Sequence, residues 1–176
     1  MKRTLIAGIG KLHGDESFGR AVARQLARTT LPEGVAVMDF GTHGHDLAYA
    51  ITGGYETVIL VDASACGGKP GTLYVMELDP ELGSTGGHNG HSVDLAVVLC
   101  LVRSSQATVG RLYLVGCEPG SHGEEEEDTD LSPQVATAIP QAIETIHLFL
   151  NELTDAEAGL HAEHRTPSPL AEPVGC

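Results

Sequence analysis

The sequence predicts an α/β sandwich in which helices cover a mostly parallel β-sheet. Two observations lead to this prediction. Short apolar runs of strand length alternate along the chain with segments whose apolar residues recur at helical spacing. The run Thr57–Asp62 (TVILVD) is rich in β-branched residues and apolar on both faces, which is typical of a central strand in a parallel sheet.

The elements before this strand follow from apolar patterning and glycine placement. Arg3–Ile9 predicts a buried first strand, and Ser17 is placed to cap the helix that follows. Val35–Phe40 predicts the second strand and His45–Ile51 a short helix. The first helix has apolar residues on one side and arginines on the other: Phe18, Ala21, Val22 and Leu26 against Arg20, Arg24 and Arg28.

Two strands and two helices follow the central strand. Thr72–Leu78 alternates after a glycine–proline turn, which indicates a strand at an antiparallel edge. Ser92–Val102 predicts an apolar helix, and Arg111–Val115 predicts the last strand.

A serine–proline pair starts a long C-terminal helix from Pro133 to Leu153. Pro140 is expected to kink or restart this helix, because proline removes a backbone donor. Beyond it, alanine, glutamate, histidine and proline occur without periodicity. We therefore expect a domain at residues 1–153 and a disordered tail at residues 154–176.

Composition excludes nucleic-acid binding. The chain has 176 residues, which suits one domain, and 10 Lys+Arg against 24 Asp+Glu give a net charge of −14. With no basic stripe to contact phosphates, and with 3 Phe, 4 Tyr and no Trp to stack on bases, the chain lacks what such proteins use. No apolar run approaches the roughly 20 residues of a membrane span, so no membrane association is expected.

Cysteine usage indicates a reducing compartment. The four cysteines have no C-x-x-C spacing and are sparse for a disulfide-stabilised secreted protein. We therefore expect a cytoplasmic protein.

The glycine-rich turn after the first strand is not a phosphate loop. In Gly8-Ile9-Gly10-Lys11, a dinucleotide fingerprint would need glycine where the chain has His13. A P-loop would need Ser or Thr after Lys11, where the chain has Leu12.

Polar residues follow the predicted strands where each strand ends. Asp15 and Glu16 follow the first strand, Asp39 ends the second, Asp62 ends the third, and His91 enters the third helix. In open α/β sheets, functional residues gather at the carboxyl ends of the strands. Two carboxylates and an imidazole at this edge can bind a divalent transition metal, including nickel or zinc, or can supply general acid–base catalysis.

Each of these residues also has a purely structural interpretation. Asp62 can cap a turn, Glu16 can complement the dipole of the first helix, and His91 can cap the third helix, whereas His88 suits an exposed loop. The residues alone therefore predict an α/β protein with a metal or acid–base site, and they do not choose between the two.

Five blocks, in order over residues 4–150, resemble motifs of one enzyme family. They are Gly8–Gly10 with Asp15–Gly19, Asp39–Gly44 with Leu47, Val61–Ala63 with Pro70–Thr72, His91–Leu95, and Gly116–Pro119 with Leu131–Val135. Together they resemble the hydrogenase maturation endopeptidases, the proteases that trim the large subunit of nickel–iron hydrogenases.

The resemblance implies a three-layer α/β/α sandwich with a five-stranded, mixed but mostly parallel sheet. It also implies an aspartic-type endopeptidase that cleaves the C-terminal extension of a nickel-loaded large-subunit precursor, and we expect this protein to be a monomer. The family's nickel ligands fall on Glu16, Asp62 and His91, and the catalytic carboxylates on Asp62 and Glu16. Nickel would arrive with the substrate, and zinc or cadmium could replace it in a crystal.

The chain departs from the family pattern beside this predicted site. Lys11 stands where the family usually has asparagine, and the loop from there to Asp15 is shorter by one residue. Ser17 and Phe40 each replace a glycine. Lys11 adds a positive charge close to Glu16, so we expect it to alter how the substrate fits.

Two other functions are consistent with the residues. The first is another α/β hydrolase on the same scaffold, such as a peptidyl-tRNA or nucleoside hydrolase. The charge of −14 and the scarcity of aromatic residues disfavour the version that acts on a nucleic acid. The second is a nickel carrier that stores metal on its nine histidines, which are scattered rather than clustered.

The acidic run Glu124–Asp128 is interpreted as a solvated loop.

Overall fold

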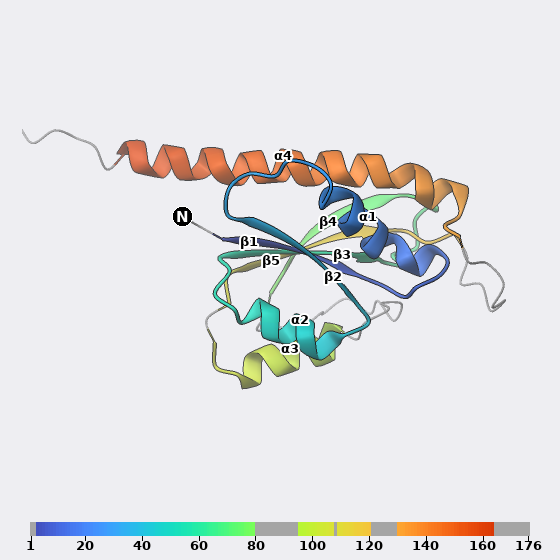
Figure 1. Ribbon diagram of the computed structural model, residues 1–176, viewed down its shortest axis with the longest axis horizontal. Coiled ribbons are helices and arrows are strands. Elements are labelled where there is room, and N and C mark those ends of the chain that lie inside the picture. The colour runs from blue at the N-terminus through green and yellow to red at the C-terminus, as the bar shows by residue number, and fades with distance from the viewer. Residues whose placement is uncertain (1–2, 80–94, 108, 121–129, 164–176) are drawn as a thin grey trace, which may run out of the picture.

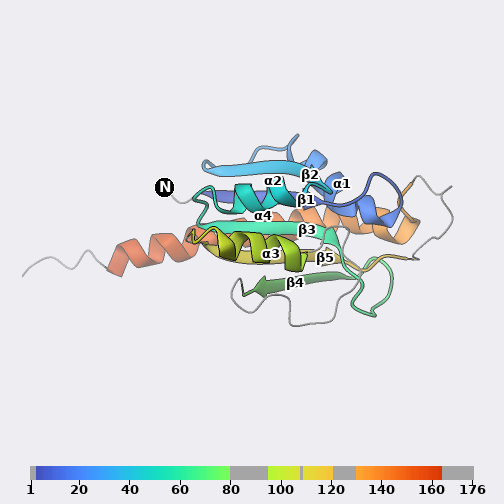
Figure 2. The same ribbon diagram turned by 90° about the horizontal axis from the view of Figure 1, so that it is seen from below.

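The computed structural model describes residues 3–79, 95–107, 109–120 and 130–163, with side chains up to residue 153. Five strands form one sheet in the order β2-β1-β3-β5-β4 (Figure 2). Their bounds are β1 Thr4–Ile9, β2 Val35–Gly41, β3 Thr57–Ala63, β4 Leu73–Leu78 and β5 Arg111–Cys117. All neighbours pair in parallel except β4, which pairs antiparallel with β5 at the edge, as its alternating sequence predicts.

Helices cover both faces of the sheet, so the chain is a three-layer α/β/α sandwich (Figure 1). One face packs against α1 (Phe18–Leu26) and α4 (Pro133–Glu163). The other face packs against α2 (Gly44–Ile51) and α3 (Leu95–Ser104). A short 3₁₀ helix, η1 (Asp15–Ser17), leads from β1 into α1 and contacts β3. Among the described helices, none has the length and apolar character that crossing a membrane requires.

Strand β3 is the centre of the molecule, and every one of its residues is buried. Its side chains alternate between the two faces: Val61 and Ala63 join the cluster under α1 and α4, whereas Val58 and Leu60 join the cluster under α2 and α3. By this alternation the side chain of Asp62 lies on the α2/α3 face, at the carboxyl end of the strand.

Helix α1 approaches the sheet closely because two glycines leave room for it. A Cβ atom on Gly19 would collide with the backbone carbonyls of Ile9 and Val61, and a Cβ on Gly8 would collide with Ala23 and Gly19. This close contact fixes the N-terminus of α1, and with it η1, over the carboxyl ends of β1 and β3.

Two details of the predicted helices are wrong. Ser17 occupies the N-cap position of α1, but its hydroxyl donates to the carbonyl of Gly14 at 2.7 Å instead of accepting from a helical N–H. Helix α4 does not end at Leu153 but continues to Glu163, and it runs through Pro140 without a restart, so of the two expectations for Pro140 only the kink stays a prediction (Figure 1).

Two physical reasons explain why α4 continues through Pro140 and past Leu153. The proline is exposed, while Ile139 and Ala142 beside it are buried in the core, so packing outweighs one missing backbone donor. The residues after Leu153 are rich in alanine and glutamate, both strong helix formers. The predicted tail beyond Glu163, the start of the third helix at Ser92 and the acidic run at 124–128 lie outside the described residues.

Candidate functional site

Buried polar side chains gather at the carboxyl edge of the sheet. Among the described residues, every buried polar or charged residue except Thr57 lies at this edge. They are Asp15, Asp62, Ser64 and Glu118. Burying polar groups costs free energy unless they are paired, so their concentration at one edge marks it as the candidate site.

Asp62 is fully buried at the end of β3, and its Oδ1 accepts a hydrogen bond of 2.8 Å from the Ala63 N–H. Its neighbour in β5 is Gly116, which has no side chain to cover the carboxylate from that strand. Asp62 is therefore a carboxylate fixed by a central, rigid strand, as its position in the sequence predicts.

Glu16 lies at the same edge, on η1. Its backbone carbonyl packs against Gly10, whose φ of 147° and lack of a Cβ allow the tight turn after β1. Its Oε2 forms an ion pair of 2.6 Å with Nζ of Lys11, and 32% of its side chain is exposed. Since η1 contacts β3, the fold brings Glu16 and Asp62 to one edge of the sheet, as the sequence predicts.

The third predicted ligand, His91, lies outside the described residues. Helix α3 runs from Leu95 to Ser104, and a short loop joins its end to the start of β5. Strand β5 starts at the amino edge of the sheet, so the end of α3 lies near that edge. The first turn of α3 therefore points to the carboxyl edge. In the described part of the chain, no three His, Cys, Asp or Glu side chains are close enough to hold a metal ion, so the three-ligand set stays a prediction.

Asp15 ties the loop before α1 to two distant segments. Its Oδ1 accepts from the Ser132 N–H at 2.7 Å, and its Oδ2 accepts from the Gly120 N–H at 2.7 Å and from the Ser132 hydroxyl at 2.9 Å. Asp15 thus holds η1, and the neighbouring Glu16, against the segments that follow β5 and precede α4. The sequence places Asp15 in the right loop but gives no sign of these partners.

Glu118 anchors the loop that follows β3. Its carboxylate accepts from the backbone N–H groups of Cys66 at 2.8 Å and Gly67 at 3.2 Å, and from the Tyr74 hydroxyl at 2.9 Å. Burial raises the pKa of this carboxyl, but the hydrogen bonds led by the Cys66 N–H outweigh it, so the pKa lies below its ordinary value. Glu118 is therefore a charged structural anchor, which the sequence shows only as part of a family motif.

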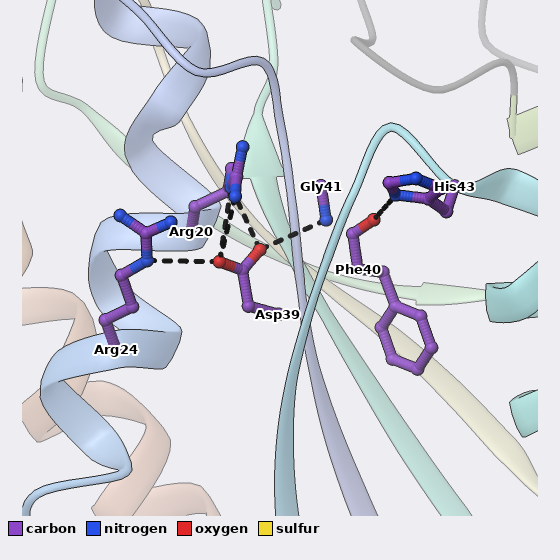
Figure 3. A network of polar contacts seen from close by, with 6 residues as sticks. All are labelled: Arg20, Arg24, Asp39, Phe40, Gly41 and His43. Atoms are coloured by element: carbon purple, nitrogen blue, oxygen red, sulfur yellow. Dashed lines mark hydrogen bonds and ion pairs between the residues drawn. The ribbon is translucent and has the colours of Figure 1, made fainter.

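Asp39, the carboxylate at the end of β2, pairs with two arginines of α1 (Figure 3). Arg20 Nε lies 3.0 Å from Oδ1, and Arg24 Nε lies 3.1 Å from Oδ2. In the same region, Nδ1 of His43 lies 3.0 Å from the Phe40 carbonyl oxygen (Figure 3). Asp39 thus joins α1 to β2, which accounts for the arginine side of the predicted helix.

The thiols near this edge are poor nucleophiles. Burial, together with the charges of Asp15 and Glu118, raises the pKa of Cys117 to about 12. Burial and the charge of Glu118 also raise the pKa of Cys66. Because the thiolate is the reactive form, a raised pKa makes neither of these two cysteines a favourable nucleophile.

The sequence is similar to those of known hydrogenase maturation proteins. HoxM of Azotobacter vinelandii, a hydrogenase expression/formation protein, is 34% identical over 175 residues, which cover 95% of this chain and 82% of HoxM. The hydrogenase 2 maturation protease of Escherichia coli K12 is 30% identical, over 85% of this chain and 92% of the relative.

Solved structures resemble the fold over most of its length. The hydrogenase maturating endopeptidase HybD of E. coli matches with a TM-score of 0.71 and 30% identity, over 85% of this chain and 93% of HybD. The [NiFe] hydrogenase maturation protease HycI of Thermococcus kodakarensis matches with a TM-score of 0.64 and 25% identity, over the same shares of each chain. The family model for hydrogenase maturation proteases matches residues 20–148. The chain therefore belongs to the hydrogenase maturation protease family.

Proposed function

We propose that this chain is a cytoplasmic, monomeric endopeptidase that removes the C-terminal extension from the nickel-loaded precursor of a nickel–iron hydrogenase large subunit. Membership of the maturation protease family supports the peptidase activity and the kind of substrate. The observation that carries the proposal for this chain is the pair of carboxylates, Asp62 and Glu16, at one edge of the sheet.

Asp62 and Glu16 suit different parts of substrate recognition. Asp62 is buried on a rigid strand, so it can hold one position relative to an incoming metal. Glu16 is partly exposed on a turn, so it can move onto a metal that the substrate brings. With His91 as third ligand they form a set of oxygen and nitrogen donors, which suits nickel and also zinc or cadmium. In this proposal nickel is part of the substrate.

Asp62 is also the proposed catalytic base. Its carboxylate takes a proton from a water molecule, whose oxygen attacks the carbonyl carbon of the scissile peptide bond. The C–N bond then breaks, and the proton passes to the leaving nitrogen. The products are a mature large subunit with a new C-terminal carboxylate and a released peptide with a new amine. This is the aspartic-type chemistry that the family resemblance implies.

In this proposal Lys11 competes with the substrate's metal ion for the Glu16 carboxylate. In the absence of substrate the Lys11 ammonium group is paired with that carboxylate at a distance of 2.6 Å. The Lys11 side chain is 60% exposed, and ion pairs of that kind are worth at most about 1 kcal/mol, so a nickel ion can displace it. Lys11 therefore shields Glu16 without blocking it.

The proposal is tested by incubating the nickel-loaded precursor with wild-type protein and with Asp62→Asn, and by measuring the intact mass of the large subunit. Wild-type protein should shorten the precursor, and Asp62→Asn, which keeps the shape but removes charge and basicity, should not. Asp46→Asn, an exposed site on α2, is the matched control and should cleave normally. Normal trimming by Asp62→Asn would refute the role of Asp62. Transfer of nickel to or from an intact precursor would favour a carrier instead.

A further inference from the structure

Ser64 directly follows β3, two positions after Asp62, and its side chain is completely buried. Its Oγ has no hydrogen-bond partner in the structure, within the limits of the described chain. Buried hydroxyl groups are nearly always paired, because an unpaired one costs stability. An exception next to a proposed catalytic carboxylate therefore calls for a partner that is absent from the free protein.

The backbone fixes the direction of this side chain. The Ser64 N–H donates to the Cys117 carbonyl at 2.8 Å, which extends the pairing of β3 with β5 by one residue. Because strand side chains alternate, Ser64 and Asp62 lie on the same face of the sheet. A Cβ on Gly116, the β5 neighbour of Asp62, would lie 2.8 Å from Ser64 Oγ and 2.9 Å from Ser64 Cβ. The glycine thus leaves space for the hydroxyl beside Asp62.

The segment after Ser64 is held by hydrogen bonds that do not involve the Ser64 hydroxyl. Glu118 binds the N–H groups of Cys66 and Gly67, and its own backbone N–H donates to the Thr72 carbonyl at 2.8 Å. These bonds hold both ends of the loop between β3 and β4. Ser64 is therefore a fixed donor whose hydrogen remains available.

We propose that the Ser64 hydroxyl is a substrate-contacting group that donates a hydrogen bond to the carbonyl oxygen of the scissile peptide bond. The inference rests on the proposed function and extends it. As water adds to the carbonyl carbon, negative charge develops on the carbonyl oxygen, and a fixed donor stabilises that charge without itself being consumed. Asp62 is as deeply buried as Ser64. The substrate must therefore reach the same buried edge of the sheet to contact either residue.

The test measures kcat, KM and thermal midpoint for Ser64→Ala with the nickel-loaded precursor. Loss of one donor to a developing oxyanion lowers kcat by about 100-fold or more, and KM should change little. The thermal midpoint should stay equal or rise, because the substitution removes an unpaired buried hydroxyl. Ser104→Ala is the control: its hydroxyl is exposed on α3, bonds the Leu101 carbonyl at 2.8 Å, and its loss should not affect kcat.

A kcat for Ser64→Ala within about twofold of wild type would overturn the inference, and so would a fall in kcat matched by a large fall in thermal midpoint. Ser64→Cys keeps the size with a weaker donor, and it should also lose most of kcat while folding normally. A folded Ser64→Cys with wild-type kcat would equally overturn the inference. Failure of the wild-type protein to cleave would instead refute the proposed function itself.

Discussion

Replacement of Asp15 is the change whose effect on stability can be worked out most fully. Asp15 is 8% exposed as a residue, and its carboxylate accepts three hydrogen bonds, from the N–H groups of Gly120 and Ser132 and from the Ser132 hydroxyl. These partners come from segments far along the chain, so Asp15 closes the loop before α1 against the end of the sheet.

Asp15→Asn keeps the size of the side chain but leaves one acceptor oxygen. Whichever way the amide turns, its NH₂ group faces the N–H of either Gly120 or Ser132, and that donor loses its partner. The loss of one charge-assisted bond to a buried donor costs about 2–3 kcal/mol. Asp15→Ala removes all three bonds and should cost about 3–5 kcal/mol. Against a total stability of roughly 5–15 kcal/mol, either change is large.

Urea denaturation followed by far-UV circular dichroism measures the effect, since the chain has no tryptophan to report by fluorescence. Asp46→Asn, exposed on α2, provides the matched control and should change the free energy of unfolding by less than about 0.5 kcal/mol. If Asp15→Asn is as mild as this control, the three bonds do not hold the loop in solution, and our account of how Glu16 is positioned is wrong.

Three further predictions concern packing, pH and substrate binding. Gly19→Ala should lower the free energy of unfolding by about 1–3 kcal/mol or more, because its Cβ would collide with the Ile9 and Val61 carbonyls. Urea titration measures this change, and an unchanged midpoint would contradict the close packing of α1. The Glu118 pKa is lowered on folding from its ordinary value of 4.5, so its contribution to stability is full above that value and is lost as pH falls through the folded pKa. The stability difference between wild type and Glu118→Gln should therefore shrink on acidification, and a constant difference would count against an ionised anchor. Lys11→Met should lower KM for the nickel-loaded precursor by up to about fivefold at low salt, and a raised KM would show that Lys11 assists binding instead.

The sequence predicts the layers of this fold well because they depend on local apolar patterns. Thr57–Asp62 is apolar on both faces and is found as the fully buried β3. Thr72–Leu78 alternates, and all of this run except Thr72 forms the antiparallel edge strand β4. Asp62 and Glu16 are predicted at one edge for a related reason: parallel strands end on the same side, so the strand boundaries alone bring them together.

What the sequence does not predict depends on partners far along the chain. The bonds of Asp15 to Ser132, and of Glu118 to Cys66, join segments that have no local pattern in common. One unpredicted contact is local: the Ser17 hydroxyl can either donate to the Gly14 carbonyl or accept from a backbone N–H of α1, and the sequence cannot show that it donates. Ser64 is unremarkable in sequence, and only its burial and its position over Gly116 draw attention to it.

The central claim is that the carboxylates at this edge serve to process a precursor that carries nickel. It is tested most directly by incubating the wild-type protein with the large-subunit precursor in two forms, nickel-loaded and nickel-free, and recording the intact mass of the large subunit over time. Our account predicts that only the nickel-loaded form is shortened, at its C-terminus. Cleavage of the nickel-free form at the same rate, or an unchanged mass in both, would contradict it.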